Sequence, residues 1–214
     1  YPVKFLGHPL VDSISNFKKN YDSSKEQIIS NKKPVIAILP GSRKQEIKKI
    51  LNTVIKIVEY FPNHQFIVAG APNIELSYYN SSLKNKNIKV IENKTYELLS
   101  ISTAAIVTSG TATLETALFK VPQVVCYKSS YFSYFIAKLI VKIKYISLVN
   151  LIMDQQIVKE LIQQDCNKVN ITNELKKILD LNHRKSLLIK YDELTSVLGN
   201  YGTSKRVALD IIKK

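Results

Sequence analysis

The chain has 214 residues, of which 45% are hydrophobic and 22% charged, so it is not disordered by composition and can form one or two domains with a buried core. The formal net charge of +14 comes almost entirely from lysine, without a run of five like charges or a nucleic-acid motif, so we expect a lysine-covered surface and no nucleic-acid partner. No apolar run reaches the roughly 18 residues that a membrane-spanning helix needs.

Short apolar segments alternate with longer amphipathic ones as far as residue 127. The short segments, rich in Val and Ile, predict buried strands at 35–39, 66–69, 88–91, 104–107 and 124–127. Apolar residues at helical spacing between Ile47 and Phe61 predict a long first helix. Further helices are expected over 75–83, 95–102 and 111–120. This alternation indicates an α/β fold, a Rossmann-like parallel sheet with helices on both faces.

The chain beyond residue 153 carries helical patterns without a strand pattern. These patterns predict C-terminal helices at 154–164, 173–179 and 185–198. The two cysteines, Cys126 and Cys166, lack the spacing of metal ligands and are interpreted as small core residues. We therefore predict no metal site and no cofactor.

The stretch ILPGSRKQEI, residues 38–47, joins the first predicted strand to the first helix. In a doubly wound sheet, ligands bind beyond the carboxyl ends of the strands, where this stretch is expected. Ser42 and Gln45 predict a capping box, and the free N–H groups of the first helical turn favour an anion. Arg43 adds a guanidinium whose fork suits phosphate oxygens. A surface arginine beside an ordinary capped helix is the alternative interpretation.

A second turn of this kind lies in TSGTATLETAL, residues 108–118. Gly110 allows a ligand to approach the backbone closely, and the hydroxyls of Ser109 and Thr111 can contact a phosphate. Glu115 lies one turn inside the helix, where its carboxylate could accept two hydrogen bonds from a vicinal diol such as a ribose; an exposed helix residue is the alternative. Two such turns favour a nucleotide-diphosphate pocket, although neither is a P-loop or a complete dinucleotide-binding pattern.

Five stretches, in this order and at these distances, resemble the lipid-A-disaccharide synthase family: FLGHPLVD (5–12), LPGSRKQEI (39–47), SGTATLETAL (109–118), YISLVNLI (145–152) and KELIQQDC (159–166). The resemblance covers essentially the whole chain but only the C-terminal half of those enzymes, which have two Rossmann-like domains in the GT-B arrangement. The chain departs from the family pattern at Val149, where the family usually has proline. This difference leaves the placement of Asn150 in question.

The resemblance implies an inverting, metal-independent hexosyltransferase of bacterial lipid A (lipopolysaccharide) biosynthesis. Such enzymes condense UDP-2,3-diacylglucosamine, the donor, with 2,3-diacylglucosamine 1-phosphate, the acceptor, and release UDP. The general base and most of the acceptor site would lie in the N-terminal half, so the catalytic residues are unknown here and the chain alone is expected to be inactive. His8 is interpreted as a hinge residue rather than a proton carrier. The implied donor-binding residues are Gly41, Ser42, Arg43, Ser109, Gly110, Thr111, Glu115 and Asn150.

The expected organisation has three parts. Residues 1–12 form the crossover between the two halves of the enzyme, 13–153 the donor-binding domain, and 154–214 the C-terminal helices. These helices are expected to pack on the cleft, on the missing half or on a partner subunit, which would form a homodimer.

Residues 127–148 combine aromatic and aliphatic side chains with lysines, a composition suited to an anionic bilayer surface. A buried helix whose lysines reach the surface is the alternative. Because the implied substrates are acylated, we expect a cytoplasmic enzyme that is peripheral on the inner face of the bacterial inner membrane. The residues expected to contact the membrane are Tyr131, Phe132, Phe135, Lys138, Lys142 and Lys144.

Two other functions fit the same sequence. One is a different GT-B enzyme with a donor of the UDP-GlcNAc type, such as a peptidoglycan transferase or a UDP-sugar epimerase, which product analysis would distinguish. The other is a basic, non-enzymatic module on a Rossmann scaffold that binds membrane or RNA. Its binding would weaken with salt, and it would not bind UDP.

Overall fold

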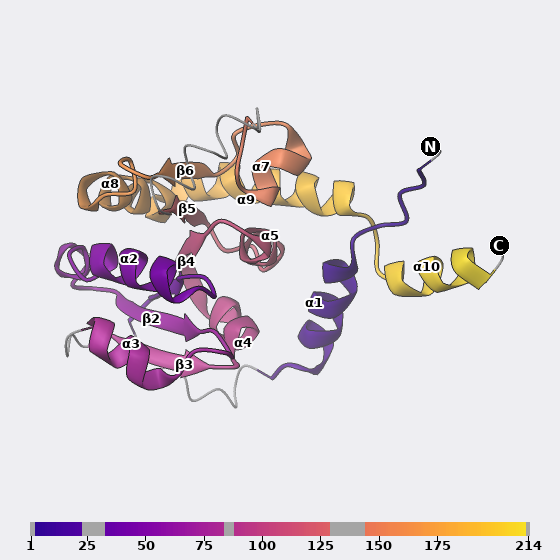
Figure 1. Ribbon diagram of the computed structural model, residues 1–214. Helices are drawn as coiled ribbons and strands as arrows, with labels where there is room; N and C mark the ends of the chain where they lie inside the picture. The colour runs from indigo at the N-terminus through magenta and orange to yellow at the C-terminus, as the bar shows by residue number, and fades with distance from the viewer. Residues whose placement is uncertain (1–2, 23–32, 84–87, 129–143, 213–214) are drawn as a thin grey trace.

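The computed structural model describes residues 3–22, 33–83, 88–128 and 144–212 (Figure 1). Its centre is a parallel sheet with strand order β3-β2-β1-β4-β5-β6. The order reverses between β1 and β4, which is the point where doubly wound sheets open a crevice for ligands. The strands are β1 (Val35–Leu39), β2 (Gln65–Gly70), β3 (Lys89–Glu92), β4 (Ser102–Thr108), β5 (Gln123–Tyr127) and β6 (Lys159–Ile162).

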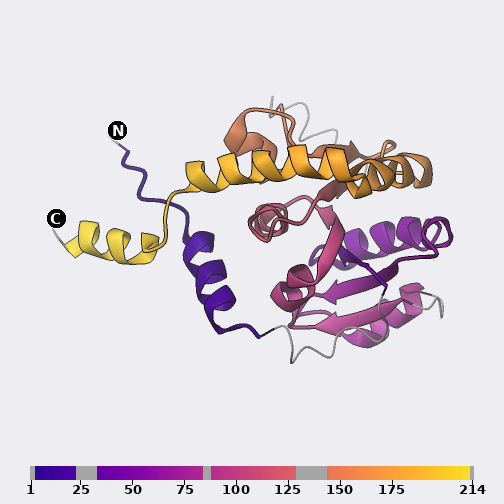
Figure 2. The same cartoon turned by 180° about the vertical axis from the view of Figure 1, so that it is seen from behind.

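Helices cover both faces of the sheet. Helices α2 and α3 lie on one face, whereas α4, α5 and the long α9 lie on the other (Figures 1 and 2). Right-handed crossovers place α2 and α3 on one face and α4 and α5 on the other, because the chain moves along the sheet in opposite directions before β3 and after it. The helices are α1 (Pro9–Asn20), α2 (Lys44–Val54), α3 (Leu76–Leu83), α4 (Thr95–Ser100), α5 (Thr111–Leu118), α7 (Leu148–Met153), α8 (Lys168–Leu179), α9 (Leu181–Leu198) and α10 (Thr203–Ile212), with a 3₁₀ turn, η2, at Val58–Tyr60.

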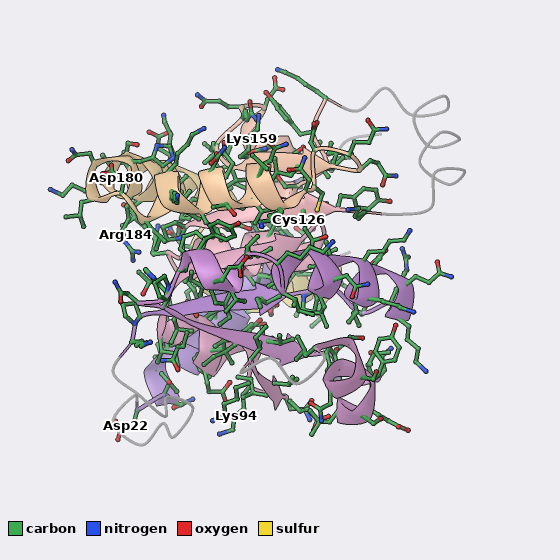
Figure 3. The ribbon with its side chains drawn as sticks, turned by 90° about the vertical axis from the view of Figure 1, so that its left-hand side faces the viewer. Asp22, Lys94, Cys126, Lys159, Asp180 and Arg184 are labelled. Atoms are coloured by element: carbon green, nitrogen blue, oxygen red, sulfur yellow. The ribbon has the colours of Figure 1, made fainter. Side chains whose placement is uncertain are left out.

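The core forms around the two central strands. All five residues of β1 are buried, because helices cover both of its faces. This double burial explains why the strand sequence is continuously apolar instead of alternating. Across the sheet, Arg184 of α9 donates a hydrogen bond to the carbonyl of Thr103 near the start of β4 (Figure 3). The five predicted strands and the α/β fold class are confirmed, with strand bounds within two residues of those expected.

One predicted helix is wrong. Residues 154–164 begin with a left-handed turn at Asp154 (φ 43°) and continue as strand β6, which pairs with β5. The apolar residues Ile157, Val158, Leu161 and Ile162 fit a helical stripe as well as a strand, and pairing with the exposed edge of β5 decides between the two. The sheet therefore continues past residue 153.

The first helix is also shorter than predicted. Helix α2 ends at Val54, and the amides of Lys56 and Ile57 bond three residues back, to Thr53 and Val54, so the chain tightens into turns and η2 before β2. The segment is rich in β-branched residues, which have modest helix propensity. Ile57 and Phe61 are still buried, so the apolar stripe reflects the core rather than one continuous helix.

The two ends of the described chain meet beside the sheet. Helix α10 extends away from the sheet and packs on α1 (Figures 1 and 2). Asp12 of α1 accepts hydrogen bonds from the amides of Gly202, Thr203 and Ser204, at 2.7, 3.2 and 2.8 Å. These bonds, with that from Ser204 first, lower the pKa of Asp12 to about 2. The predicted division at residues 12 and 153 stays a prediction.

Candidate functional site

The candidate site is a pocket at the carboxyl ends of β1 and β4, the adjacent central strands at which the strand order reverses. Its volume is about 490 Å³, within the range of small-molecule sites. It brings together seven of the eight sequence-predicted donor residues. They are Gly41, Ser42, Arg43, Ser109, Gly110, Thr111 and Glu115.

The β1–α2 turn forms one wall of the pocket. Gly41 has φ +93°, a conformation that favours glycine, and a Cβ there would lie 3.1 Å from Oε2 of Glu46. The predicted capping box is wrong: the N-cap is Arg43 rather than Ser42, and no side chain caps the helix. Arg43 instead lies 3.1 Å from Glu46, and its side chain is 80% exposed. This ion pair places the Arg43 guanidinium at the rim of the pocket, and an exposed pair contributes little stability by itself.

The β4–α5 turn forms the opposite wall and is more firmly held. The Ser109 hydroxyl donates a 2.6 Å hydrogen bond to the carbonyl of Ile146. The Thr113 hydroxyl donates to the carbonyl of Gly110, at 2.8 Å. Gly110 is the N-cap of α5 and has no side chain, so the first amides of this helix are also without a side-chain cap.

The helices that begin at the pocket differ from those elsewhere. Helices α2, α4 and α5 start at or beside residues that line it, and no side chain caps any of the three. By contrast, the N-termini of α1, α8 and α9 are capped by His8, Asn167 and Asp180. The uncapped amides and the helix dipoles create a positive potential at the pocket, which suits an anion such as a diphosphate.

Glu115 supplies a negative charge to the same pocket. Its Oε1 accepts a 2.9 Å hydrogen bond from the hydroxyl of Tyr96 on α4. Burial raises the pKa of the Tyr96 phenol, with a further contribution from Glu115, so the phenol remains a donor at neutral pH. A carboxylate fixed in this way beside an anion site can accept hydrogen bonds from ligand hydroxyls.

Asn150, the eighth predicted residue, does not line the pocket. It is buried, and its Oδ1 accepts from the amides of Ile157 and Val158, while its Nδ2 donates to Val158 and to Glu160. This carboxamide joins α7 to β6, so the structure assigns it a supporting position behind the Ser109 turn.

Two residues of the site region were missed by sequence reasoning. Glu160 of β6 accepts hydrogen bonds from the amides of Ile146 and Ser147 and from the Ser147 hydroxyl, and thereby fixes the carbonyl that Ser109 contacts. No sequence signal identified it, because residue 160 was expected in a helix. Thr108 also lines the pocket, and its buried Oγ1 lacks a hydrogen-bond partner among the described residues. Its position at the end of a predicted strand, next to Ser109, was a sequence signal that could have identified it as a pocket residue.

Other sequence predictions lie away from this pocket. His8 accepts a hydrogen bond from the amide of Leu10 and caps α1, and it does not line the pocket. Cys126, labelled in Figure 3, and Cys166 are buried free thiols, as expected of core residues. Within the described ranges, no cluster of three His, Cys, Asp or Glu side chains has the geometry of a metal site.

The proposed membrane-contact residues fall mostly outside the described part of the chain. Tyr131, Phe132, Phe135, Lys138 and Lys142 lie there. Lys144 is described: its Nζ is 3.3 Å from Asp154 and its side chain is 65% exposed. None of the helices in the described ranges is both long and apolar enough to cross a bilayer.

Solved structures share this fold. The chain matches an S. aureus MnaA–UDP co-structure with a TM-score of 0.63 at 16% identity, over 95% of this chain and 52% of that one. It matches WaaG, a glycosyltransferase of lipopolysaccharide biosynthesis, with a TM-score of 0.54 at 12% identity, over 94% and 50%. Identities this low show the fold alone. The class is therefore a Rossmann-like α/β domain with a parallel sheet, the fold that these two structures share.

Sequence comparisons identify the family within this class. A family model described as lipid-A-disaccharide synthetase matches residues 1–206. The lipid-A-disaccharide synthase of Coxiella burnetii (strain Dugway 5J108-111) is 34% identical over 97% of this chain, and that of Sulfurihydrogenibium sp. (strain YO3AOP1) is 33% identical over 97%. The chain belongs to the lipid-A-disaccharide synthetase family. It spans 56% and 58% of these two relatives, about half of their length.

Proposed function

We propose that the chain is the donor-binding half of a lipid A glycosyltransferase and that its pocket holds the UDP part of UDP-2,3-diacylglucosamine. The observation that carries this proposal is the convergence of uncapped helix N-termini, Arg43 and Glu115 on one pocket in a member of this family. The diphosphate would lie between the Gly41–Arg43 and Ser109–Thr111 turns. Glu115 would accept hydrogen bonds from the ribose hydroxyls.

The proposed reaction transfers the diacylglucosamine group to 2,3-diacylglucosamine 1-phosphate with inversion and releases UDP. As the glycosidic bond to the diphosphate breaks, negative charge grows on the departing UDP. Fixed donors already directed at the diphosphate stabilise this charge without a metal ion, because they need no reorganisation when the bond breaks. In this proposal the donors are the Arg43 guanidinium, the amides of α2 and α5, and the hydroxyls of Ser42 and Thr111.

The remaining parts of the reaction belong to the half of the enzyme that this chain does not span. We assign the general base and most of the acceptor site to that half, so the 214-residue chain should bind the donor nucleotide without forming disaccharide. We also propose a cytoplasmic location, peripheral on the inner membrane through residues 127–148, and a homodimer formed through the C-terminal helices. The acylated substrates and the aromatic and lysine content of 127–148 support the membrane contact.

Titration calorimetry of the chain with UDP, UMP and ADP tests the proposed site. UDP should bind about tenfold more tightly than UMP, because the second phosphate gains charge-assisted hydrogen bonds. UDP should also bind more tightly than ADP if the pocket recognises uracil. Equal binding of UDP and UMP would contradict the diphosphate site, and salt-sensitive RNA binding without UDP affinity would favour the non-enzymatic alternative.

A further inference from the structure

Helix α4 contributes a side chain that acts on the pocket without lining it. Tyr96 donates its hydroxyl hydrogen to Oε1 of Glu115 at 2.9 Å. In the described part of the chain, no other side chain or backbone group forms a hydrogen bond with this carboxylate. Therefore one carboxylate oxygen of Glu115 accepts the hydrogen bond from Tyr96, and the other is available to a ligand.

The ring of Tyr96 is held by aromatic neighbours from two other helices. The ring of Phe119, just after α5, lies 5.1 Å from it between centroids, and that of Phe17 on α1 lies 5.4 Å away in an edge-on arrangement. Phe17 and Phe119 also contact each other, at 5.8 Å. Helix α1 lies beside α5 (Figure 1). Because this triangle of rings fixes the direction of the Tyr96 hydroxyl, the hydroxyl in turn restricts the rotation of the Glu115 carboxylate.

We infer that Tyr96 is a positioning residue that fixes the Glu115 carboxylate for recognition of the two hydroxyls of a ribose. A vicinal diol presents two donors at a fixed separation, so a carboxylate recognises it best when its rotation is already restricted. The hydrogen bond from Tyr96 provides that restriction and leaves acceptor sites facing the pocket. This inference rests on the proposed nucleotide site. It adds that Tyr96 determines how strongly the site discriminates between ribose and deoxyribose.

The arrangement also connects the start of the chain to the pocket. Phe17 belongs to α1, which follows the crossover segment and is joined to α10 through Asp12. A displacement of α1 would loosen the Tyr96 ring before it changed the diphosphate turns, because none of the pocket-lining residues belongs to α1. Recognition of the ribose should therefore depend on α1, whereas recognition of the diphosphate should not.

The test compares UDP with 2′-deoxy-UDP by titration calorimetry of the 214-residue chain. The parent should bind UDP more tightly, and Tyr96→Phe should reduce the ratio of the two affinities about three- to tenfold, since the variant loses a hydrogen bond to a charged group but keeps the ring. Affinity for inorganic pyrophosphate should not change. Phe17→Leu, which loosens the ring and keeps the hydroxyl, should produce a smaller fall in the same ratio. Thermal unfolding of each variant establishes that it folds.

Two further variants make the test specific. Tyr78→Phe is the matched control, because Tyr78 also donates a short hydrogen bond, 2.6 Å to the carbonyl of Lys44, but does not contact Glu115. It should leave the affinity ratio unchanged. In a Glu115→Ala background, Tyr96→Phe should have no further effect on the ratio, which a purely structural role would not predict.

The outcomes separate this inference from the function on which it rests. If the parent discriminates against 2′-deoxy-UDP and Tyr96→Phe discriminates equally well, Tyr96 is only a core residue. If the parent binds UDP tightly without preferring it to the deoxy form, Glu115 does not contact the 2′-hydroxyl and the inference is wrong, although the diphosphate site stands. If the parent binds no UDP, the proposed function fails and this inference fails with it.

Discussion

Two regions of the molecule use helix N-termini in opposite ways. At the pocket, α2 and α5 begin without a side-chain cap. At the junction of α1 and α10, the Asp12 carboxylate accepts hydrogen bonds from three amides at the start of α10, although Asp12 precedes the first of these donors by 190 residues. In both places the groups are the backbone N–H groups of a first helical turn. At the pocket a ligand can reach them, whereas at α10 the Asp12 side chain already accepts their hydrogen bonds.

In the proposed function, this difference separates amides that bind an anion from amides that stabilise the fold. A capped terminus stabilises the fold because its N–H groups are paired in the absence of any ligand. An uncapped terminus leaves its N–H groups to water until an anion displaces that water. Loss of an exposed side chain at the pocket rim, such as Arg43, should therefore change affinity more than stability, whereas substitutions at Asp12 should change the local stability of α10 and leave affinity for the diphosphate unchanged.

Among the variants considered, Arg43→Ala should have the largest effect, and the quantity that it changes is the affinity for UDP. The change removes a charged donor from the pocket rim and should weaken UDP binding by about 1.5–3 kcal/mol, the range for hydrogen bonds to charged groups. Thermal stability should be nearly unchanged, because the side chain is 80% exposed. Arg43→Lys should recover part of the affinity, since it keeps the charge and loses the fork. Unchanged UDP affinity in Arg43→Ala, measured by calorimetry, would remove Arg43 from the site.

Gly41→Ala and Gly110→Ala should differ from each other. Both glycines have positive φ, but a Cβ at Gly41 would lie 3.1 Å from Glu46 and 3.4 Å from Thr108, whereas a Cβ at Gly110 would meet nothing within 4 Å. Gly41→Ala should lower the free energy of unfolding by about 1–2 kcal/mol through strain and close contact. Gly110→Ala should cost less, since it adds strain alone. Denaturant unfolding measures both, and equal losses would contradict the close packing of the first turn.

Ser109→Ala should have a moderate effect on stability. The variant loses the 2.6 Å hydrogen bond to the carbonyl of Ile146, which corresponds to about 0.5–1.5 kcal/mol of unfolding free energy. Ser42→Ala is the matched control, because Ser42 is exposed and has no side-chain hydrogen bond among the described residues. It should leave the unfolding midpoint unchanged. Similar losses in both variants would mean that the second turn is no better organised than the first.

Acid should release α10, and this is the smallest of these effects. The pKa of Asp12 is lowered to about 2, so its stabilising contribution is complete above its ordinary value of 3.8 and is lost as the pH falls through about 2. Amide hydrogen exchange in α10 should therefore accelerate between pH 4 and pH 2, beyond the intrinsic change in exchange rate. Asp12→Asn should remove most of this pH dependence. Equal protection of α10 in parent and variant at both pH values would contradict the cap.

Local patterns in the sequence identified most of the sheet and the two pocket turns. Buried parallel strands are continuously apolar, and the glycine- and hydroxyl-rich turns that follow β1 and β4 have few other interpretations in such a sheet. The sequence therefore determined the fold class and seven of the eight residues expected at the pocket. The capping box was wrong because the spacing of Ser42 and Gln45 does not reveal which residue leaves the helical conformation.

Only the tertiary structure decided which side chains serve the pocket and which support it. Asn150, Glu160 and Tyr96 each depend on partners in another element or turn: Asn150 pairs with β6, Glu160 with the Ile146–Ser147 amides, and Tyr96 with Glu115 on α5. Strand β6 likewise exists because the edge of β5 is available to it. Hydrogen bonds and sheet pairings between distant segments carry no local periodicity, so residues that look alike in sequence acquire different roles once the chain folds.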